Sequence, residues 1–406
     1  MSALLDGIRV IEFASHGVGP IAGLVLTQMG AEVIKIEHPA GGDPTRQGNV
    51  RAGTPVRTVP PGNHTIIFEF TNRNKKSVTV NLSKKEGLEV AYKLIEKADA
   101  FFSNYLPKSL NKLGFDYETL SKRNPKLVYA ASSSYGSKGP DANKPAFDPF
   151  ALVRSGLIAA STDPDTPPIE IKGTVADCLG GTFLAFAVIS GLLARERLGR
   201  GQEIQSSLVG PLVWAQLWSV SQSLTGGELA QLRNIFSPLG NNYKCKDGQW
   251  IRVGTGMEEA GWPEFCHLFG LESLEQDPRF DSPLKRVNNS AVLIQIVADL
   301  LRSKTRNEWI NYIKEFIPKY VLYEGIYNVS ELGDDPQLLA NNYIVEDNHA
   351  TLGKIKMLRF PMNFSETNVA MNLKPAPQLG EHTEEILLQT GYSQNDVKEM
   401  RKNKII

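Results

Sequence analysis

The chain has 406 residues, of which 22% are charged and 41% hydrophobic, as in ordinary soluble globular proteins. Its 44 Lys and Arg residues balance 44 Asp and Glu residues, which argues against a nucleic-acid-binding protein, because such proteins usually carry a basic excess. The three cysteines form no disulfide framework, so we expect a cytoplasmic protein. The N-terminus lacks a signal-peptide pattern, and we expect no membrane-spanning segment, since no apolar stretch reaches roughly 18 residues without charged or turn-forming residues.

The N-terminal third of the chain alternates between strand and helix patterns. The predicted strands are residues 8–13, 33–37, 78–82, 100–103 and 127–131, and the predicted helices are residues 20–29 and 86–97. Residues 39–63 are polar and rich in Gly and Pro, which predicts a long loop. The alternation predicts an α/β fold with a parallel sheet.

The rest of the chain changes character after a long predicted helix at residues 179–197. A short strand at residues 202–209 and a helix at residues 214–224 follow it. Residues 243–256 are typical of a β-hairpin that turns at Asp247-Gly248, and residues 258–313 are rich in helix patterns. We place a smaller domain at residues 228–325, and we expect the helix that begins at Glu384 to return to the first domain.

Two segments have the composition of phosphate-binding sites, and each has a structural alternative. Residues 17–23 (Gly-Val-Gly-Pro-Ile-Ala-Gly) lie on a strand-to-helix turn and resemble a dinucleotide fingerprint, although the spacing differs from GxGxxG and Pro20 removes one N–H donor. The alternative is a tight turn that binds no cofactor. Residues 72–77 (Asn-Arg-Asn-Lys-Lys-Ser) are a basic cluster that could hold a phosphate, but a solvated turn is the favoured interpretation.

Asp177 is the best candidate for a nucleophile. It precedes the apolar run 182–193 and is followed by Gly180 and Gly181, which would leave room for a bound group. The alternative is an ordinary helix N-cap, since Asp is favoured there. The chain has no GxSxG elbow, no recognisable cysteine nucleophile motif, and no HExxH, CxxC or paired histidines, so we predict no metal site.

An ordered set of motifs along nearly the whole chain resembles the class III coenzyme A transferases, the family of formyl-CoA transferase and carnitine CoA-transferase. The motifs are Leu5-Asp-Gly-Ile-Arg-Val10, Gly19-Pro20, Gly30-Ala-Glu-Val-Ile-Lys-Ile-Glu37, Gly42-Asp-Pro44, residues 72–77, Ala98-Asp99, Asn104-Tyr105, Asn124-Pro125, Val128-Tyr129-Ala130, Ala176-Asp177, Leu198-Gly-Arg-Gly-Gln202 and Leu379-Gly-Glu-His-Thr-Glu384.

The resemblance implies a Rossmann-like large, CoA-binding domain built from both chain ends, plus a smaller α+β middle domain. The corresponding boundaries are 1–200 and 340–406 for the large domain, 228–325 for the small one, and linkers at 201–227 and 326–339. It also implies an interlocked dimer, either of identical chains or with a related subunit. We expect no nucleic-acid or membrane partner.

The resemblance further implies a chemistry. Asp177 would attack an acyl-CoA thioester, giving a mixed anhydride, and CoA would pass to a free carboxylic acid. Ionised aspartate needs no base to be nucleophilic at neutral pH. No tightly bound cofactor is implied, because CoA and acyl-CoA are substrates. A succinyl-CoA donor is an expectation from its abundance, and no residue points to it.

Positions that match the CoA contacts of the family follow from the same motifs. They are Gly17, Val18, His38, Asn81, Leu82, Asn104, Tyr105, Lys112, Ser134 and Tyr135. Two of them depart from the family pattern: His38 stands where a family member has Arg, and Lys112 stands where Arg is frequent. The glycine-rich loop of formyl-CoA transferase is not evident, which argues against formyl-CoA as the donor.

Three rival functions remain at this point. A 2-methylacyl-CoA racemase of the same fold needs a His in a Gly-His-Asp segment, and this chain has Ala146-Phe147-Asp148 instead. An NAD-dependent Rossmann oxidoreductase would use the turn at residues 17–23. A non-catalytic partner subunit would not need Asp177, which this chain keeps.

Overall fold

The computed structural model describes residues 3–48, 50–51, 54–60, 64–162, 166–227, 239–256, 258–367 and 373–406. The chain divides into two compact units. The first contains residues 1–160, 168–226 and 342–406, and the second contains residues 161–167 and 227–341. Each unit has its own hydrophobic core.

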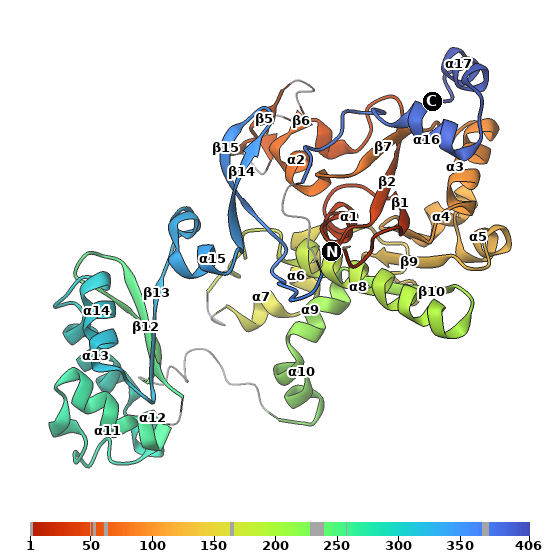
Figure 1. The fold of residues 1–406 in the computed structure, drawn as a ribbon. Helices are drawn as coiled ribbons and strands as arrows, with labels where there is room; N and C mark the ends of the chain where they lie inside the picture. The colour runs from red at the N-terminus through yellow and green to blue at the C-terminus, as the bar shows by residue number, and fades with distance from the viewer. Residues whose placement is uncertain are drawn as a thin grey trace. The chain divides into compact units, whose positions relative to one another are not determined.

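The first unit is built on a six-stranded parallel sheet (Figure 1). Its order is β10-β9-β8-β1-β2-β7, and every neighbouring pair is parallel. The strands are β1 (Arg9–Phe13), β2 (Glu32–Glu37), β7 (Lys76–Thr79), β8 (Ala100–Ser103), β9 (Val128–Ser133) and β10 (Gln202–Ser207). Numbered along the sheet, this is the 3-2-1-4-5-6 order of a Rossmann fold. The predicted α/β class and parallel sheet are confirmed.

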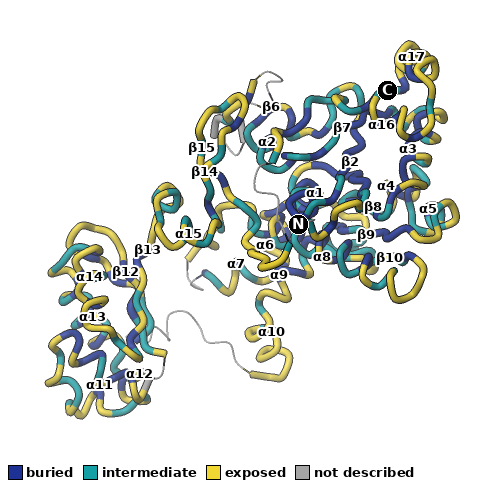
Figure 2. Tube along the Cα trace, viewed as in Figure 1, coloured by how far each residue is buried: buried dark blue, intermediate teal, exposed yellow. Residues whose placement is uncertain are grey.

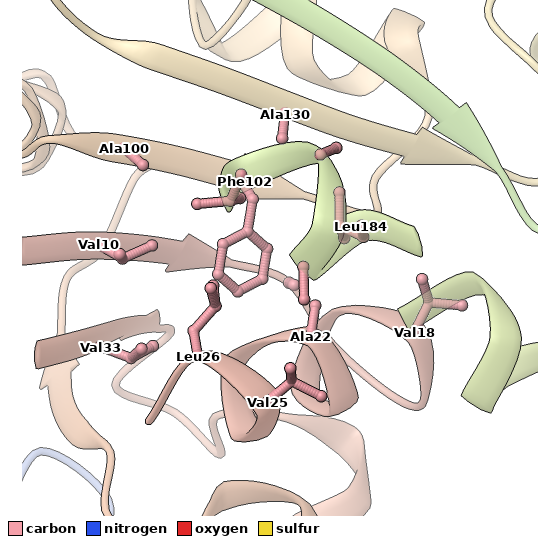
Figure 3. Close-up of a cluster of buried hydrophobic side chains, with 14 of the residues drawn as sticks. Val10, Val18, Ala22, Val25, Leu26, Val33, Ala100, Phe102, Ala130 and Leu184 are labelled. Atoms are coloured by element: carbon pink, nitrogen blue, oxygen red, sulfur yellow. The ribbon is translucent and has the colours of Figure 1, made fainter. Parts of the chain in front are cut away.

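Helices pack on both faces of this sheet, because strands buried on two sides need two apolar layers. On one face α1 (Val18–Gln28) and α8 (Val175–Leu198) cover Val10, Phe102 and Ala130 (Figure 3). On the other face the core includes residues of α3, α4, α5, α16 and α17. These helices are α3 (Lys85–Glu96), α4 (Pro107–Leu113), α5 (Tyr117–Arg123), α16 (Thr383–Thr390) and α17 (Gln394–Lys402).

Shorter elements complete the first unit. They are η1 (Pro44–Arg46), β3 (Val50–Arg51), β4 (Thr54–Pro55), β5 (Thr58–Val59), β6 (His64–Thr65), α2 (Ile66–Asn72), α6 (Asp148–Arg154), α7 (Leu157–Ala160), α9 (Val209–Ala215), α10 (Leu217–Leu224), β14 (Ile344–His349) and β15 (Gly353–Leu358). The described part of the predicted loop 39–63 therefore holds a 3-10 turn and short strand pairs.

Helix α8 is long and apolar. By length and hydropathy alone it could cross a membrane, although it contains Asp177 and three glycines. Its residues Leu184, Ala185 and Val188 are instead buried in the core, and 56% of its most apolar window is buried. Figure 2 shows buried residues along the central strands and exposed residues along α10. The apolar character of α8 is that of a central core helix.

The second unit is an antiparallel sheet covered by helices. Strands β11 (Gly240–Lys244), β12 (Trp250–Thr255) and β13 (Val321–Ile326) pair in that order. The predicted hairpin is confirmed, since Lys244 pairs with Trp250. The other elements are α11 (Glu258–Phe269), η3 (Glu272–Leu274), α12 (Pro283–Asn288), α13 (Ser290–Leu301), α14 (Arg306–Phe316), η4 (Val329–Asp334) and α15 (Pro336–Ala340).

The segments predicted as linkers are ordered parts of the two units, which is a correction. Residues 202–207 form β10 and pair along their whole length with β9, so this segment is an edge strand of the central sheet. Residues 329–340 form η4 and α15 within the second unit. The expected return of the C-terminal helix is confirmed: Thr79 donates its backbone N–H to Oγ1 of Thr383 at 3.0 Å.

Candidate active site

A cavity of about 630 Å³ lies at the carboxyl ends of β1, β8 and β9. The chain leaves β1 toward one edge of the sheet and β8 toward the other, so their ends border the switch point where ligands bind in open α/β sheets. Residues that follow these strands form its wall, among them Ser15, Asn104 and Ser134. Asp177, from the start of α8, lines the same cavity.

Asp177 lies inside the first turn of α8 rather than ahead of the helix. The helix begins at Val175 after the N-cap Thr174, so the N-cap interpretation of Asp177 is wrong. Asp177 is buried, and its backbone N–H donates to Oδ2 of Asp148 at 2.9 Å. A carboxylate in the first turn of a helix is favoured by the helix dipole.

The carboxyl group of Asp177 packs directly against Gly17. A Cβ atom at Gly17 would lie 2.0 Å from Oδ2 of Asp177 and 2.3 Å from its Cγ. Gly17 is the N-cap of α1, so the N-termini of two helices converge on one carboxyl group. Both helix dipoles therefore favour a negative charge at this place.

The other glycines of these two helices serve close packing. A Cβ at Gly181 would lie 2.7 Å from Ile21, and one at Gly180 would lie 3.3 Å from Leu208. The expectation that they leave room for an acyl group is wrong, because they let α8 approach α1. A Cβ at Gly23 would lie 2.1 Å from Oε2 of Glu12, so the absence of a side chain at Gly23 leaves room for the buried Glu12 carboxylate.

Replacing Gly17 with Ala is expected to displace the Asp177 carboxylate and to lower turnover by about 100-fold, the typical cost of misplacing a reacting group by an ångström. Measuring kcat with thermal unfolding alongside separates this effect from a loss of folding. Gly180→Ala is the matched control, because its added methyl meets only methyl groups of Leu208 and Val18, at 3.3 Å or more, and no part of Asp177. A Gly17→Ala enzyme with normal kcat would show that Asp177 does not need this contact.

Several predicted CoA-contact residues come together in the cavity, namely Gly17, Val18, Asn104, Tyr105 and Ser134. The side chain of Asn104 accepts the backbone N–H of Ser15 at 3.1 Å and donates to its carbonyl oxygen at 2.7 Å. This amide therefore ties the end of β8 to the end of β1. Tyr105 stacks on Phe13 with ring centroids 4.7 Å apart.

The other predicted contacts do not line this cavity. Asn81 and Leu82 follow β7, which is the far edge strand, and Leu82 packs on the core. His38 is exposed after β2, and Lys112 is exposed in the last turn of α4. Tyr135 lies instead 5.5 Å from both Lys144 and Arg154. For these five residues, contact with a part of CoA outside the cavity stays a prediction.

The basic cluster at residues 72–77 is neither a solvated turn nor a phosphate site, which corrects both interpretations. Arg73 is buried and pairs with Asp347 at 2.7 Å. Lys75 is buried and pairs with Oε2 of Glu12 at 2.8 Å. Both cations are therefore committed to carboxylates far away in the sequence.

Glu12 belongs to a buried charge network that the sequence analysis missed. Nζ of Lys35 lies 2.7 Å from Oε1 of Glu12 and 2.9 Å from Oδ2 of Asp43. Burial alone would lower the pKa of Lys35, but the attraction of Asp43 and Glu12 outweighs it and raises the pKa. Asp43 in turn accepts the backbone N–H groups of His16 and Thr45, which line the cavity. Through Asp43, the network therefore holds two residues of the cavity wall in place.

Burial alone would raise the pKa of Asp43, but Lys35 and the hydrogen bonds from Thr45 lower it to about 2. For Lys75 burial is decisive and lowers the pKa to about 8 despite the attraction of Glu12. The only sign of this network in the sequence was the presence of charged residues inside β1 and β2, because a strand buried on both faces is normally apolar.

The comparison with known families accounts for this geometry. The model of CoA-transferase family III matches residues 5–383. The chain belongs to CoA-transferase family III. It is thus an enzyme of the CoA-transferase class, and the resemblance stated from its motifs is confirmed.

Relatives of this CoA-transferase align with it over most of its length. It is 30% identical over 406 residues to the (R)-2-hydroxy-4-methylpentanoate CoA-transferase of Clostridioides difficile, covering 99% of both chains. It is 28% identical to the human succinyl-CoA:glutarate CoA-transferase, covering 94% of this chain and 85% of the relative. A crystal structure of a CAIB/BAIF family protein from Brucella suis superposes with a TM-score of 0.83 at 27% identity, covering 96% of this chain and all of that one.

Proposed function

We propose that this enzyme moves CoA from an acyl-CoA thioester to a free carboxylic acid through a mixed anhydride on Asp177. The observation that carries the proposal is the placement of the Asp177 carboxyl group against Gly17, at the N-termini of both α1 and α8, inside the cavity. A carboxylate held there is a nucleophile without a base. The same helix N-termini favour the oxyanion that develops when it attacks a carbonyl.

The reaction can proceed by exchange of carboxylates alone. An Asp177 oxygen attacks the thioester carbonyl, the C–S bond breaks, and CoA leaves as the thiolate. The acceptor carboxylate then attacks the acyl carbonyl and releases Asp177, which leaves an anhydride of the donor and acceptor acids. Asp177 attacks the acceptor carbonyl of this anhydride and expels the donor as its carboxylate. The thiolate finally attacks the acceptor–Asp177 anhydride, giving the new thioester and the free Asp177 carboxylate. No step needs a proton, because each attacking group (the Asp177 carboxylate, the acceptor carboxylate or the thiolate) is already an anion.

Asp148 has a positioning role in this proposal. Its Oδ2 accepts the backbone N–H of Asp177, and it is itself buried in the first turn of α6. Because Asp148 fixes the backbone at the start of α8, it holds the nucleophile in place without touching the reacting carbonyl.

The racemase alternative lacks the histidine of its Gly-His-Asp segment. Phe147 lies in the cavity where the racemase would need a His, and its ring is 5.4 Å from that of His16. Phenylalanine cannot exchange a proton, and attack at a carbonyl leaves the α-hydrogen in place.

A single experiment separates the two reactions. A chiral 2-methylacyl-CoA is incubated in D₂O with the enzyme and the isotopically labelled free acid. We expect the label to enter the thioester pool at catalytic rates while no deuterium enters the α-position, both read by mass spectrometry. Rapid α-deuteration that disappears in Asp177→Ala would identify a racemase instead.

We also propose that the enzyme is a cytoplasmic dimer, of identical chains or with a related subunit. The support is a set of exposed apolar side chains on α8, α9 and α10 of the first unit. They are Phe186, Leu193, Trp214, Leu217, Trp218 and Leu224. An apolar surface of this kind marks an interface with another protein. Analytical ultracentrifugation measures the assembly directly.

A further inference from the structure

The charge of the cavity around Asp177 restricts which acyl groups it can hold. Among its described lining side chains there are two carboxylates, Asp148 and Asp177, one histidine, His16, and no lysine or arginine. Three buried cations of the first unit are already committed to carboxylates. Lys35 and Lys75 both pair with Glu12, and Arg46 pairs with Glu37.

A dicarboxylic acyl group would bring a second carboxylate into this cavity. That charge would be desolvated beside Asp148, with no described cation to compensate it, and a buried charge without a partner is strongly disfavoured. A monocarboxylic acyl group brings no such charge once it is joined to CoA or to Asp177.

The hydroxyl of Ser132 is a free hydrogen-bonding group in the same cavity. Ser132 is only 3% exposed, and its Oγ has no hydrogen-bond partner among the residues that the structure describes. The two neighbouring hydroxyls are engaged, since Oγ of Ser133 accepts the N–H of Gly136 and Oγ of Ser134 accepts that of Ala146. A buried hydroxyl without a partner is uncommon in a native protein, and a ligand group is one way to satisfy it.

The strand pattern directs Ser132 toward the nucleophile. Side chains alternate between the two faces of a strand, so Ser132 shares a face with Val128 and Ala130. Those two residues belong to the core that includes α1 and α8. Ser132 therefore points to the face of the sheet from which α8 presents Asp177.

We propose that the acyl group transferred by this enzyme is monocarboxylic and carries a neutral hydrogen-bonding substituent, such as a hydroxyl, that Ser132 binds. The rest of the acyl group would meet apolar side chains of the lining, including Ile67, Phe147 and Leu208. This inference rests on the proposed function, and it argues against succinyl-CoA as the donor, because the succinyl group carries a second carboxylate.

The test compares three acyl groups with the same five-carbon chain. Each thioester (pentanoyl-CoA, 2-hydroxypentanoyl-CoA or glutaryl-CoA) is incubated with its own ¹³C-labelled free acid, and label entering the thioester gives kcat/KM. Donor and acceptor are then the same acyl group, so no separate choice of donor is needed. We expect both monocarboxylic pairs to exchange at least about 100-fold faster than the glutaryl pair, since the buried charge is unpaired. The wild-type enzyme suffices for this arm.

The second arm tests the hydroxyl of Ser132. Ser132→Ala should lower kcat/KM for the 2-hydroxypentanoyl pair by about tenfold, the usual effect of losing one hydrogen bond to a substrate, and leave the pentanoyl pair within about threefold. Ser133→Ala is the matched control, because its hydroxyl already has a partner, so it should affect both pairs equally. The pentanoyl pair also reports whether each variant is folded.

The outcomes separate this inference from the proposed function. Glutaryl exchange as fast as pentanoyl exchange would overturn the charge argument while leaving CoA transfer intact. An equal loss for both monocarboxylic pairs in Ser132→Ala would overturn the role of its hydroxyl. Failure of all three pairs, with Asp177 unmodified by acyl-CoA, would contradict the proposed function itself.

Discussion

Replacing Asp177 with Ala is expected to lower CoA-transferase turnover at least about 1,000-fold, which corresponds to roughly 4 kcal/mol of activation free energy. The covalent route needs this carboxylate, and no neighbouring group in the described cavity can replace it, because Asp148 is engaged with the Asp177 backbone. CoA binding should change little, since Asp177 lies at one end of α8 in a cavity with many other lining residues. Steady-state kinetics and a CoA-binding titration measure the two effects.

A chemical trap tests the same prediction independently of turnover. Wild-type enzyme incubated with acyl-CoA and hydroxylamine should acquire a hydroxamate at Asp177, detected by peptide mass spectrometry. Asp148→Ala is the matched control: it should react more slowly because its nucleophile is less well held, but still be labelled at Asp177. Near-normal turnover in Asp177→Ala would exclude the anhydride mechanism.

Replacing Lys35 with Met should destabilise the first unit by about 3–5 kcal/mol, because the change removes one of the two cations from a fully buried network. The side chains of Lys35, Glu12 and Asp43 are all 0% exposed, so Asp43 would keep its desolvation cost without its ion-pair partner, while Glu12 would retain only Lys75. Hydrogen exchange at the amides of β1 and β2 measures the free energy of opening where the network lies.

Lys76→Met provides the control for this stability prediction. Lys76 also joins two carboxylates, Glu32 and Glu385, but its side chain is 26% exposed and that of Glu385 is 48% exposed. A pair so accessible to water contributes at most about 1 kcal/mol. Equal losses in the two variants would show that burial does not set the strength of these ion pairs.

The central sheet could be predicted because its signals are local. The sheet strands β1, β2, β7, β8 and β9 each overlap a short run rich in apolar residues, and the βα alternation fixes their parallel direction. The predicted ends of the elements were less accurate. The error with the largest consequence is the start of α8, because it decides where Asp177 lies relative to the helix. Thr174 makes no capping hydrogen bond, so nothing in the sequence separates Asp177 at the third helical position from Asp177 ahead of the helix.

The site was only partly predictable, because its remaining features depend on contacts between distant segments. The charges of Lys75 and Arg73 indicate exposure when read alone, and only the folded sheet brings Glu12 and Asp347 to them. Gly17 was singled out for phosphate binding, whereas the structure shows that its missing side chain makes space for Asp177, 160 positions along the chain. A pattern within one segment cannot reveal its partner in another.

The division of the first unit between both chain ends sets the order in which the protein can fold during synthesis. Its second core layer includes Ile386, Leu387 and Val397, which leave the ribosome after the other buried residues of that layer. The second unit has a separate core whose last buried residue is Val321, so it can fold while the sheet still lacks two of its covering helices, α16 and α17. Until α16 and α17 emerge, the nascent sheet exposes apolar surface and is open to premature association.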